Sequence, residues 1–72
     1  MIIYRDLIRR DNSRESARWL SLDDVMPTLG AHLLHDGILY ELLVINDVRV
    51  LDVADRSESQ YYRLEWFEVD GE

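Results

Sequence analysis

The sequence contains no cysteine and no lysine, only one proline and only three glycines. Without cysteine, neither a disulfide bond nor a thiolate metal site can stabilise the fold, and this composition fits a reducing compartment. The shortage of glycine and proline indicates short loops, because these residues dominate turns. The chain has 72 residues, of which 47% are hydrophobic. We therefore expect a single small domain, residues 1–72, with its own core and modest stability.

Long apolar segments are also missing. Uninterrupted apolar runs are short, as at residues 42–45, far below the roughly 20 residues that a membrane-spanning helix needs. The first residues lack the basic start and the apolar centre of a signal peptide. We therefore expect a soluble, cytoplasmic protein that does not bind membranes.

The net charge is −7, and all eight basic side chains are arginine. An acidic surface repels the phosphates of DNA and RNA, so no direct binding to nucleic acid is expected. Residues 1–20 carry five arginines and three acids, a net of +2, whereas residues 21–72 carry three arginines and twelve acids, a net of −9. This second part of the chain can attract a basic protein. An acidic surface that only keeps the protein soluble is the simpler alternative.

Residues 2–9 fit a strand or a helix. Ile2 and Tyr4 alternate as on one face of a strand, whereas Tyr4 and Ile8 lie four apart, as on a helix. The β-branched start and the turn-rich residues 10–15 that follow favour the strand.

The next segment, residues 17–22, is expected to form a strand that pairs back on the first one. A short helical turn should follow at residues 22–27, because Ser21 can cap a helix N-terminus and two acids lie in the first turn. Pro27 ends this turn, since proline disfavours helical geometry in the residue before it.

The Asp36-Gly37 pair between apolar flanks predicts a β-hairpin, because a type I′ turn needs positive φ at both central residues. The hairpin would join strands at residues 31–35 and 38–45. Asn46-Asp47 predicts another two-residue turn, followed by a strand at residues 48–54. The apolar pattern of that strand slips by one residue, which indicates a β-bulge near residues 50–51.

A polar loop at residues 55–60 is expected before the last strand, residues 61–69. In that strand Tyr62, Leu64 and Trp66 alternate, and large aromatic side chains in a small protein usually fill the core. Tyr61 and Phe67 have the opposite phase and therefore suit an interface better.

These segments predict a mainly β fold. About five short antiparallel strands would close into a small, partly open, SH3-like barrel with one short helical turn near residues 22–27. The alternative is an α+β meander with an N-terminal helix.

No catalytic motif is present. His32 and His35 are three apart, so on a strand they face opposite sides, which favours ordinary strand histidines over a metal site. The chain has no Gly-rich phosphate loop and no serine in a nucleophile-elbow context. We therefore expect no catalytic residues, no metal, no cofactor and no enzymatic activity; a small metal protein built on the two histidines is the alternative.

The composition fits a protein-binding module whose acidic face docks on a basic protein of the nucleic-acid-binding or nuclease type. Immunity proteins, anti-CRISPR proteins and other nuclease inhibitors, including those of phages and mobile elements, are proteins of this kind. The alternative is a small adaptor or accessory subunit that self-associates through apolar and aromatic strand edges, as a homodimer for example. Glu65 should be exposed, because it alternates away from Leu64 and Trp66. The candidate partner-binding residues are Asp47, Asp52, Asp55, Glu58, Tyr61, Glu65, Phe67, Glu68 and Asp70.

Overall fold

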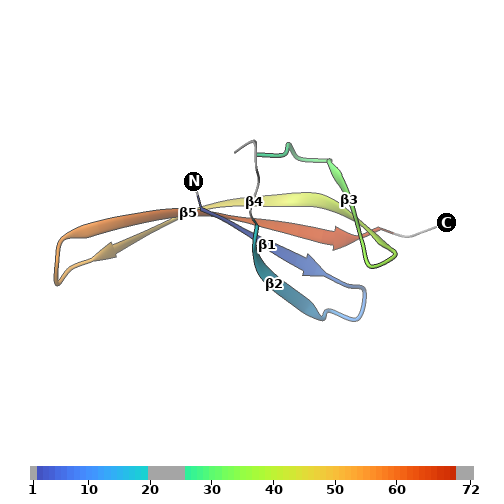
Figure 1. The fold of residues 1–72 in the computed structure, drawn as a ribbon, viewed down its shortest axis with the longest axis horizontal. Coiled ribbons are helices and arrows are strands. Elements are labelled where there is room, and N and C mark those ends of the chain that lie inside the picture. The colour runs from blue at the N-terminus through green and yellow to red at the C-terminus, as the bar shows by residue number, and fades with distance from the viewer. Residues whose placement is uncertain (1, 20–25, 70–72) are drawn as a thin grey trace.

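A computed structural model describes residues 2–19 and 26–69, which form one curled sheet of five strands. The strand order is β2-β1-β5-β4-β3, and the sheet curls into a half-barrel (Figure 1). Among the described residues, no helix is long and apolar enough to pass through a membrane. The strands are β1 (Ile3–Ile8), β2 (Arg14–Trp19), β3 (His32–His35), β4 (Ile38–Asp52) and β5 (Ser57–Glu68).

The predicted fold class, a mainly β protein with five strands in a partly open barrel, is confirmed. The alternative with an N-terminal helix is wrong, because Ile3–Ile8 form a strand. The expected pairing of the second segment with the first is confirmed, although β2 is Arg14–Trp19 instead of residues 17–22. Of the helical turn expected at residues 22–27, positions 22–25 lie outside the described residues, and Met26 and Pro27 belong to no helix or strand.

The strands were predicted to be antiparallel, and this is wrong for one pairing: three pairings are antiparallel and one is parallel. β1 pairs with β2, β4 with β3, and β4 with β5 in antiparallel register, whereas β1 and β5 run parallel from Ile3↔Tyr62 to Ile8↔Phe67. The outermost strands β2 and β3 are not neighbours in the sheet, so the barrel has an open seam. Near one end of the seam, His35 Nε2 of β3 lies 3.7 Å from Glu15 Oε2 of β2.

The hairpin predicted at Asp36-Gly37 is confirmed. Asp36 has φ of 50° and Gly37 has φ of 79°, so both central residues take the left-handed conformation that a type I′ turn requires. The turn joins β3 to β4 in the register His35↔Ile38. The turn conformation and the strand register therefore agree with what the Asp-Gly pair predicts.

The second predicted turn, Asn46-Asp47, is wrong, because both residues lie within the continuous strand β4. The predicted bulge near residues 50–51 is also wrong. The register shift lies between Leu42 and Val44, and it is here that the apolar pattern of β4 changes face. The polar loop expected at residues 55–60 is shorter than predicted, because the turn covers residues 53–56 and Ser57 already begins β5.

One face of the sheet, here called the inner face, carries the hydrophobic core. The pairing register places side chains from β1, β4 and β5 on this face, where alternate residues of each strand meet. Trp66 is buried as predicted, and its ring packs edge-to-face on Trp19 with centroids 6.3 Å apart. Tyr62 is partly buried against the same cluster. The buried core residues are Ile3, Leu7, Tyr40, Leu42, Leu64 and Trp66.

Three buried polar atoms on the inner face have no hydrogen-bond partner within the described part of the chain. They are Arg5 Nε, Tyr40 Oη and Trp66 Nε1. A buried donor or acceptor without a partner costs about 1–3 kcal/mol. The apolar contacts of this small core must therefore offset the free-energy cost of these unpaired polar atoms.

A two-stranded arm projects from the half-barrel. β1 covers the edge of β5 only from Tyr62 onward, and β3 pairs with β4 only up to Glu41. Residues 46–61, here called the arm, therefore extend to one side as a hairpin of β4 and β5 (Figure 1). The arm makes the molecule elongated, with principal extents of 50 × 28 × 18 Å. A two-stranded ribbon is only marginally stable in water, so this part depends on its continuity with the sheet.

Candidate functional site

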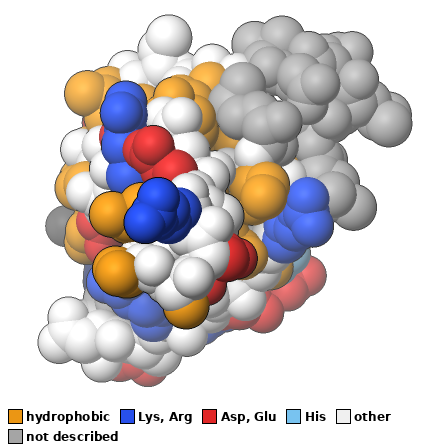
Figure 2. Space-filling model, turned by 90° about the vertical axis from the view of Figure 1, so that its left-hand side faces the viewer, with side chains coloured by type: hydrophobic (Ala, Val, Ile, Leu, Met, Phe, Trp, Pro, Cys, Tyr) orange, Lys and Arg blue, Asp and Glu red, His pale blue; other side chains and the backbone are white. Residues whose placement is uncertain are grey.

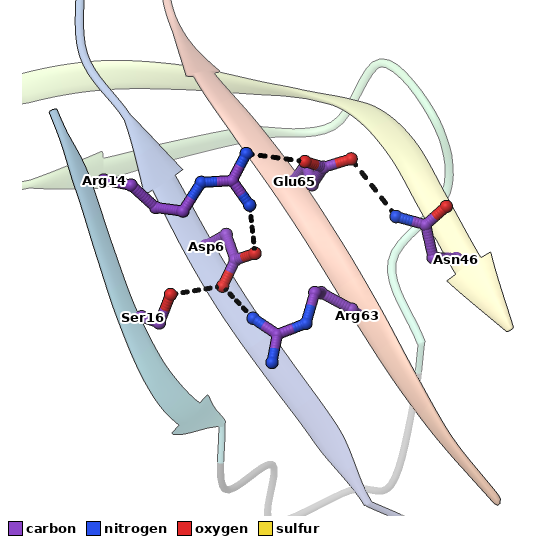
Figure 3. A network of polar contacts seen from close by, with 6 residues as sticks. All are labelled: Asp6, Arg14, Ser16, Asn46, Arg63 and Glu65. Atoms are coloured by element: carbon purple, nitrogen blue, oxygen red, sulfur yellow. Dashed lines mark hydrogen bonds and ion pairs between the residues drawn. The ribbon is translucent and has the colours of Figure 1, made fainter. Parts of the chain in front are cut away.

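The opposite face of the sheet, here called the outer face, contains a buried carboxylate. Asp6 lies in the middle of β1, and its side chain is 0% exposed. Its Oδ1 accepts hydrogen bonds from Ser16 Oγ at 2.7 Å and from Arg63 Nη1 at 2.6 Å, and its Oδ2 accepts one from Arg14 Nη1 at 2.9 Å (Figure 3). The register Ser16↔Asp6↔Glu65 brings these groups together from β2, β1 and β5.

A second carboxylate extends this network to a fourth strand. Arg14 Nη2 donates to Glu65 Oε1 at 3.1 Å, and Asn46 Nδ2 donates to Glu65 Oε2 at 3.1 Å (Figure 3). The Arg63 guanidinium also lies over the Tyr4 ring, 5.2 Å from its centroid. The two acids and two arginines therefore compensate one another, and their contacts link side chains of β2, β1, β5 and β4.

Burial by itself raises the pKa of the Asp6 carboxyl. The hydrogen bonds from Arg63 and Ser16, together with the positive charges of Arg63 and Arg14, outweigh burial and hold this pKa below its usual value. The covering side chains of Arg14 and Arg63 are themselves 49% and 31% exposed, so both guanidinium groups remain in contact with solvent. The charged form of Asp6 is therefore the form that the folded protein stabilises.

This lowered pKa predicts an acid-dependent loss of stability. Because the carboxyl binds its proton more weakly in the folded state, its contribution is complete above the unfolded pKa near 3.8 and is lost as pH falls through the lower folded pKa. We expect the free energy of unfolding to drop between about pH 6 and about pH 3, and to drop less in Asp6→Asn. Urea denaturation at both pH values measures this. Asp11 and Asp55, whose pKa values are also lowered, are present in both proteins, so equal drops would contradict the prediction.

The structure places two predicted partner-binding acids in contacts with arginines of the same chain. Glu65 was expected to be exposed, but its side chain is only 17% exposed because Arg14 covers it. Glu68, 23% exposed, lies 3.7 Å from the Arg10 guanidinium and accepts a hydrogen bond from the Arg10 backbone N–H. Neither carboxylate is available without breaking these contacts.

The two predicted aromatic contact residues lie on the outer face, because along β5 they alternate with the inner-face residues Tyr62, Leu64 and Trp66. Tyr61 is half-buried and packs edge-to-face against Tyr4, with ring centroids 5.3 Å apart. Phe67 is also half-buried, in register with Ile8 of β1. Both side chains therefore already pack against the sheet, and only part of each is open to a partner.

The remaining predicted acids within the described residues gather on the arm. Asp47 Oδ1 accepts a hydrogen bond from Gln60 Nε2 at 3.0 Å, and Asp47 Oδ2 lies 3.9 Å from the Arg49 guanidinium. Asp52 and Asp55 accept backbone N–H bonds from Ala54 and Ser57 that shape the turn. The pKa of Asp55 is lowered by its hydrogen bonds to the Ser57 side chain and backbone. Asp70 lies outside the described residues.

At the end of the arm, carboxylates without an arginine partner lie beside exposed apolar side chains. Within the described ranges, Asp52, Asp55 and Glu58 form no ion pair, whereas Leu51 is 66% and Val53 is 81% exposed. We call residues 50–58 the arm tip. Figure 2 views the molecule from the side on which the arm ends and shows acidic, basic and hydrophobic side chains close together. The surface is therefore mixed and not uniformly acidic.

Sequence reasoning missed the apolar part of the arm tip. The side chains of Val50, Leu51 and Val53 were assigned to an ordinary strand, although the neighbouring polar residues 55–60 could have suggested a projecting hairpin. The Asp6 network was missed as well. Its only signal in the sequence is Asp6, which interrupts the apolar face formed by Ile2, Tyr4 and Ile8.

The two histidines contact carboxylates on opposite faces of β3. His32 Nε2 lies 3.8 Å from Glu41, and His35 Nε2 lies 3.3 Å from Asp36 and 3.7 Å from Glu15. Across residues 2–19 and 26–69, no group of three or more His, Asp or Glu side chains is arranged to hold a metal ion.

Comparisons with protein-family models, with curated proteins and with solved structures found no match to this chain.

Proposed function

We propose that this protein is a non-enzymatic protein-binding module whose arm tip docks on a basic protein of the nucleic-acid-binding or nuclease type. The observation that supports this is that, among the described residues, the three carboxylates of Asp52, Asp55 and Glu58 have no arginine partner at the end of a projecting hairpin. A protein built to hold phosphates presents Arg and Lys side chains in a groove. Carboxylates on a narrow arm can occupy the same positions.

A specific interface also needs apolar contacts, and the exposed apolar side chains of the arm tip can provide them. Charge complementarity speeds encounter and selects the partner, but affinity depends largely on buried apolar and aromatic anchors. Leu51 and Val53 can supply such anchors, because both are more than half exposed on the arm. In this proposal the protein acts as an inhibitor, since the arm fills the site that would otherwise bind nucleic acid.

A charge-neutralising variant of the arm tip tests the proposal. In Asp52→Asn/Asp55→Asn/Glu58→Gln the amides keep the shape of the side chains and can still accept the turn hydrogen bonds. We expect the dissociation constant for a purified basic nuclease to rise about tenfold or more. Binding of the unmodified protein to a panel of basic nucleases should also weaken steeply between about 50 and 500 mM salt.

The matched control removes three negative charges elsewhere. Asp11→Asn/Asp36→Asn/Glu41→Gln changes the net charge by the same amount at exposed or half-buried positions outside the arm. We expect this variant to change the dissociation constant less than about threefold. An equal loss of affinity in both variants would show nonspecific attraction, and no binding to any basic nuclease at low salt would overturn the proposal.

A further inference from the structure

The long strand β4 has a covered half and an open half. β3 pairs with it from Ile38 to Glu41, and Ala31 O accepts a hydrogen bond from Leu42 N just beyond β3. From residue 43 to residue 52 no strand among the described residues lies along this edge. An open edge of this length presents unpaired backbone N–H and C=O groups, which are a template for another strand.

This open edge carries few of the features that prevent pairing, and its charged residues are Asp47, Arg49 and Asp52. Residues 44–52 contain no proline and no lysine, and the bulge of β4 lies before them, between Leu42 and Val44. Val50 and Leu51 are 50% and 66% exposed. The edge therefore has the backbone and the apolar surface that another strand could cover.

The charge sequence of the edge is complementary to itself in one register. When two copies pair antiparallel about a two-fold axis at Val48, Asp47 of each copy lies opposite Arg49 of the other. Ile45 then lies opposite Leu51, and Val48 lies opposite Val48. Opposite charges at directly facing positions stabilise a sheet, and like charges destabilise it.

The neighbouring registers are less favourable. An axis at Arg49 places two arginines opposite each other, and an axis at Asp47 places two aspartates opposite each other. An axis at Val50 leaves Arg49 facing Leu51 and Asp47 facing Val53. Of the four registers compared, centred on residues 47, 48, 49 and 50, only the one centred on Val48 forms two reciprocal ion pairs.

Asp47 and Arg49 also lie on the same face of β4, where the Asp47 carboxylate is 3.9 Å from the Arg49 guanidinium. A two-fold axis perpendicular to the sheet keeps like faces together, so the two copies would bring four alternating charges into one cluster. We propose that a second copy of this chain pairs with the open edge of β4 in the register centred on Val48, which joins the two half-barrels into one continuous sheet.

Single cysteines test this register directly, because the natural chain has none. In Val48→Cys the two Cα atoms would lie about 4.5–5.5 Å apart, within disulfide range. In Val50→Cys the two cysteines would be four residues apart along the strands, or about 13 Å, which is too far. Under mild oxidation we expect a disulfide-linked dimer from Val48→Cys and none from Val50→Cys. Faster linking of Val50→Cys would overturn the register.

A charge swap tests the ion pairs. Sedimentation of the unmodified protein over a wide concentration range should show a monomer–dimer equilibrium. We expect Asp47→Arg to raise the dimer dissociation constant roughly tenfold or more, and Asp47→Arg/Arg49→Asp to restore it, because the swap recreates the reciprocal pairs. Glu41→Arg changes the net charge equally where β3 already covers the strand, and should leave the equilibrium unchanged.

A monomer at every concentration, or a double variant as weak as Asp47→Arg, would overturn the proposal. Circular dichroism of each variant separates loss of pairing from loss of folding. The inference does not depend on the proposed function, because it concerns the edge of β4 and no basic partner is present in these experiments.

Discussion

Asp6→Ala is expected to lower the free energy of unfolding by about 2–4 kcal/mol, because it leaves two arginines without the carboxylate that they share. Asp6 accepts hydrogen bonds from Arg14, Arg63 and Ser16, and its side chain is 0% exposed. Removal of one partner of a buried ion pair usually costs more, but Arg14 and Arg63 are partly exposed and can regain water. Urea denaturation followed by circular dichroism measures the change.

Two variants define the origin of this loss. Asp6→Asn keeps the acceptor oxygen but removes the charge, so a smaller loss of about 1–2 kcal/mol is expected. Asp36→Asn removes the charge of a carboxylate that is 82% exposed, and asparagine tolerates the positive φ of this turn position, so its effect should be smaller than that of Asp6→Asn. A double-mutant cycle of Asp6 with Arg63 should show favourable coupling. If Asp6→Ala proves as stable as the unmodified protein, the network does not hold the strands together.

Leu64→Ala is expected to lower the free energy of unfolding by about 2–5 kcal/mol. Leu64 is 0% exposed on the central strand β5, in register with Arg5 of β1 and Ile45 of β4. The substitution leaves a cavity where three strands meet, and the remaining core is too small to fill it. For a domain whose total stability is of the order of 5 kcal/mol, the variant would keep at most about 3 kcal/mol and would be largely unfolded at the upper end of this loss.

The matched control is Leu51→Ala on the arm. Leu51 is 66% exposed, so the same truncation should change the free energy of unfolding by about 0.5 kcal/mol or less. Chemical denaturation of both variants at low protein concentration, where self-association is minimal, compares core with arm directly. A large loss for Leu51→Ala under these conditions would show that the arm is part of the folding core instead of a projecting element.

Local signals in the sequence predicted local structure. The Asp36-Gly37 turn was predicted correctly because its requirement, positive φ at two adjacent residues, is met by those two residues alone. The alternation of Tyr62, Leu64 and Trp66 correctly placed Trp66 in the core, since side-chain alternation is a property of one strand. Both features need no information about distant segments.

Features that depend on distant partners were not predicted. Asn46-Asp47 has the composition of a turn, yet both residues remain in β4 because they pair with Arg63 and Tyr62 of β5. Tertiary pairing thus overrides local preference at this point. The bulge was expected near residues 50–51 because the apolar pattern of the sequence slips there. The sequence shows that the pattern slips, but only the register with β5 shows where the bulge lies.

The candidate site shows the same division. The acidic excess of residues 21–72 was visible in the sequence, but the partner of each acid was not. Arg63 reaches Asp6 across 57 positions of the chain, and Arg14 reaches Glu65 across 51. Such contacts follow from the parallel pairing of β1 with β5. The structure was therefore needed to distinguish the acids that are paired with an arginine from those that are not.

The parallel pairing of β1 with β5 also determines how the molecule resists a pulling force. The two strands point the same way, so the start of β1 and the end of β5 lie at opposite ends of the pair (Figure 1). Tension applied through those two points slides one strand along the other, and all the backbone bonds between them are loaded together in shear. An antiparallel hairpin opened from its free end loses such bonds one at a time. Tension along this direction therefore meets the sheet where it is mechanically strongest.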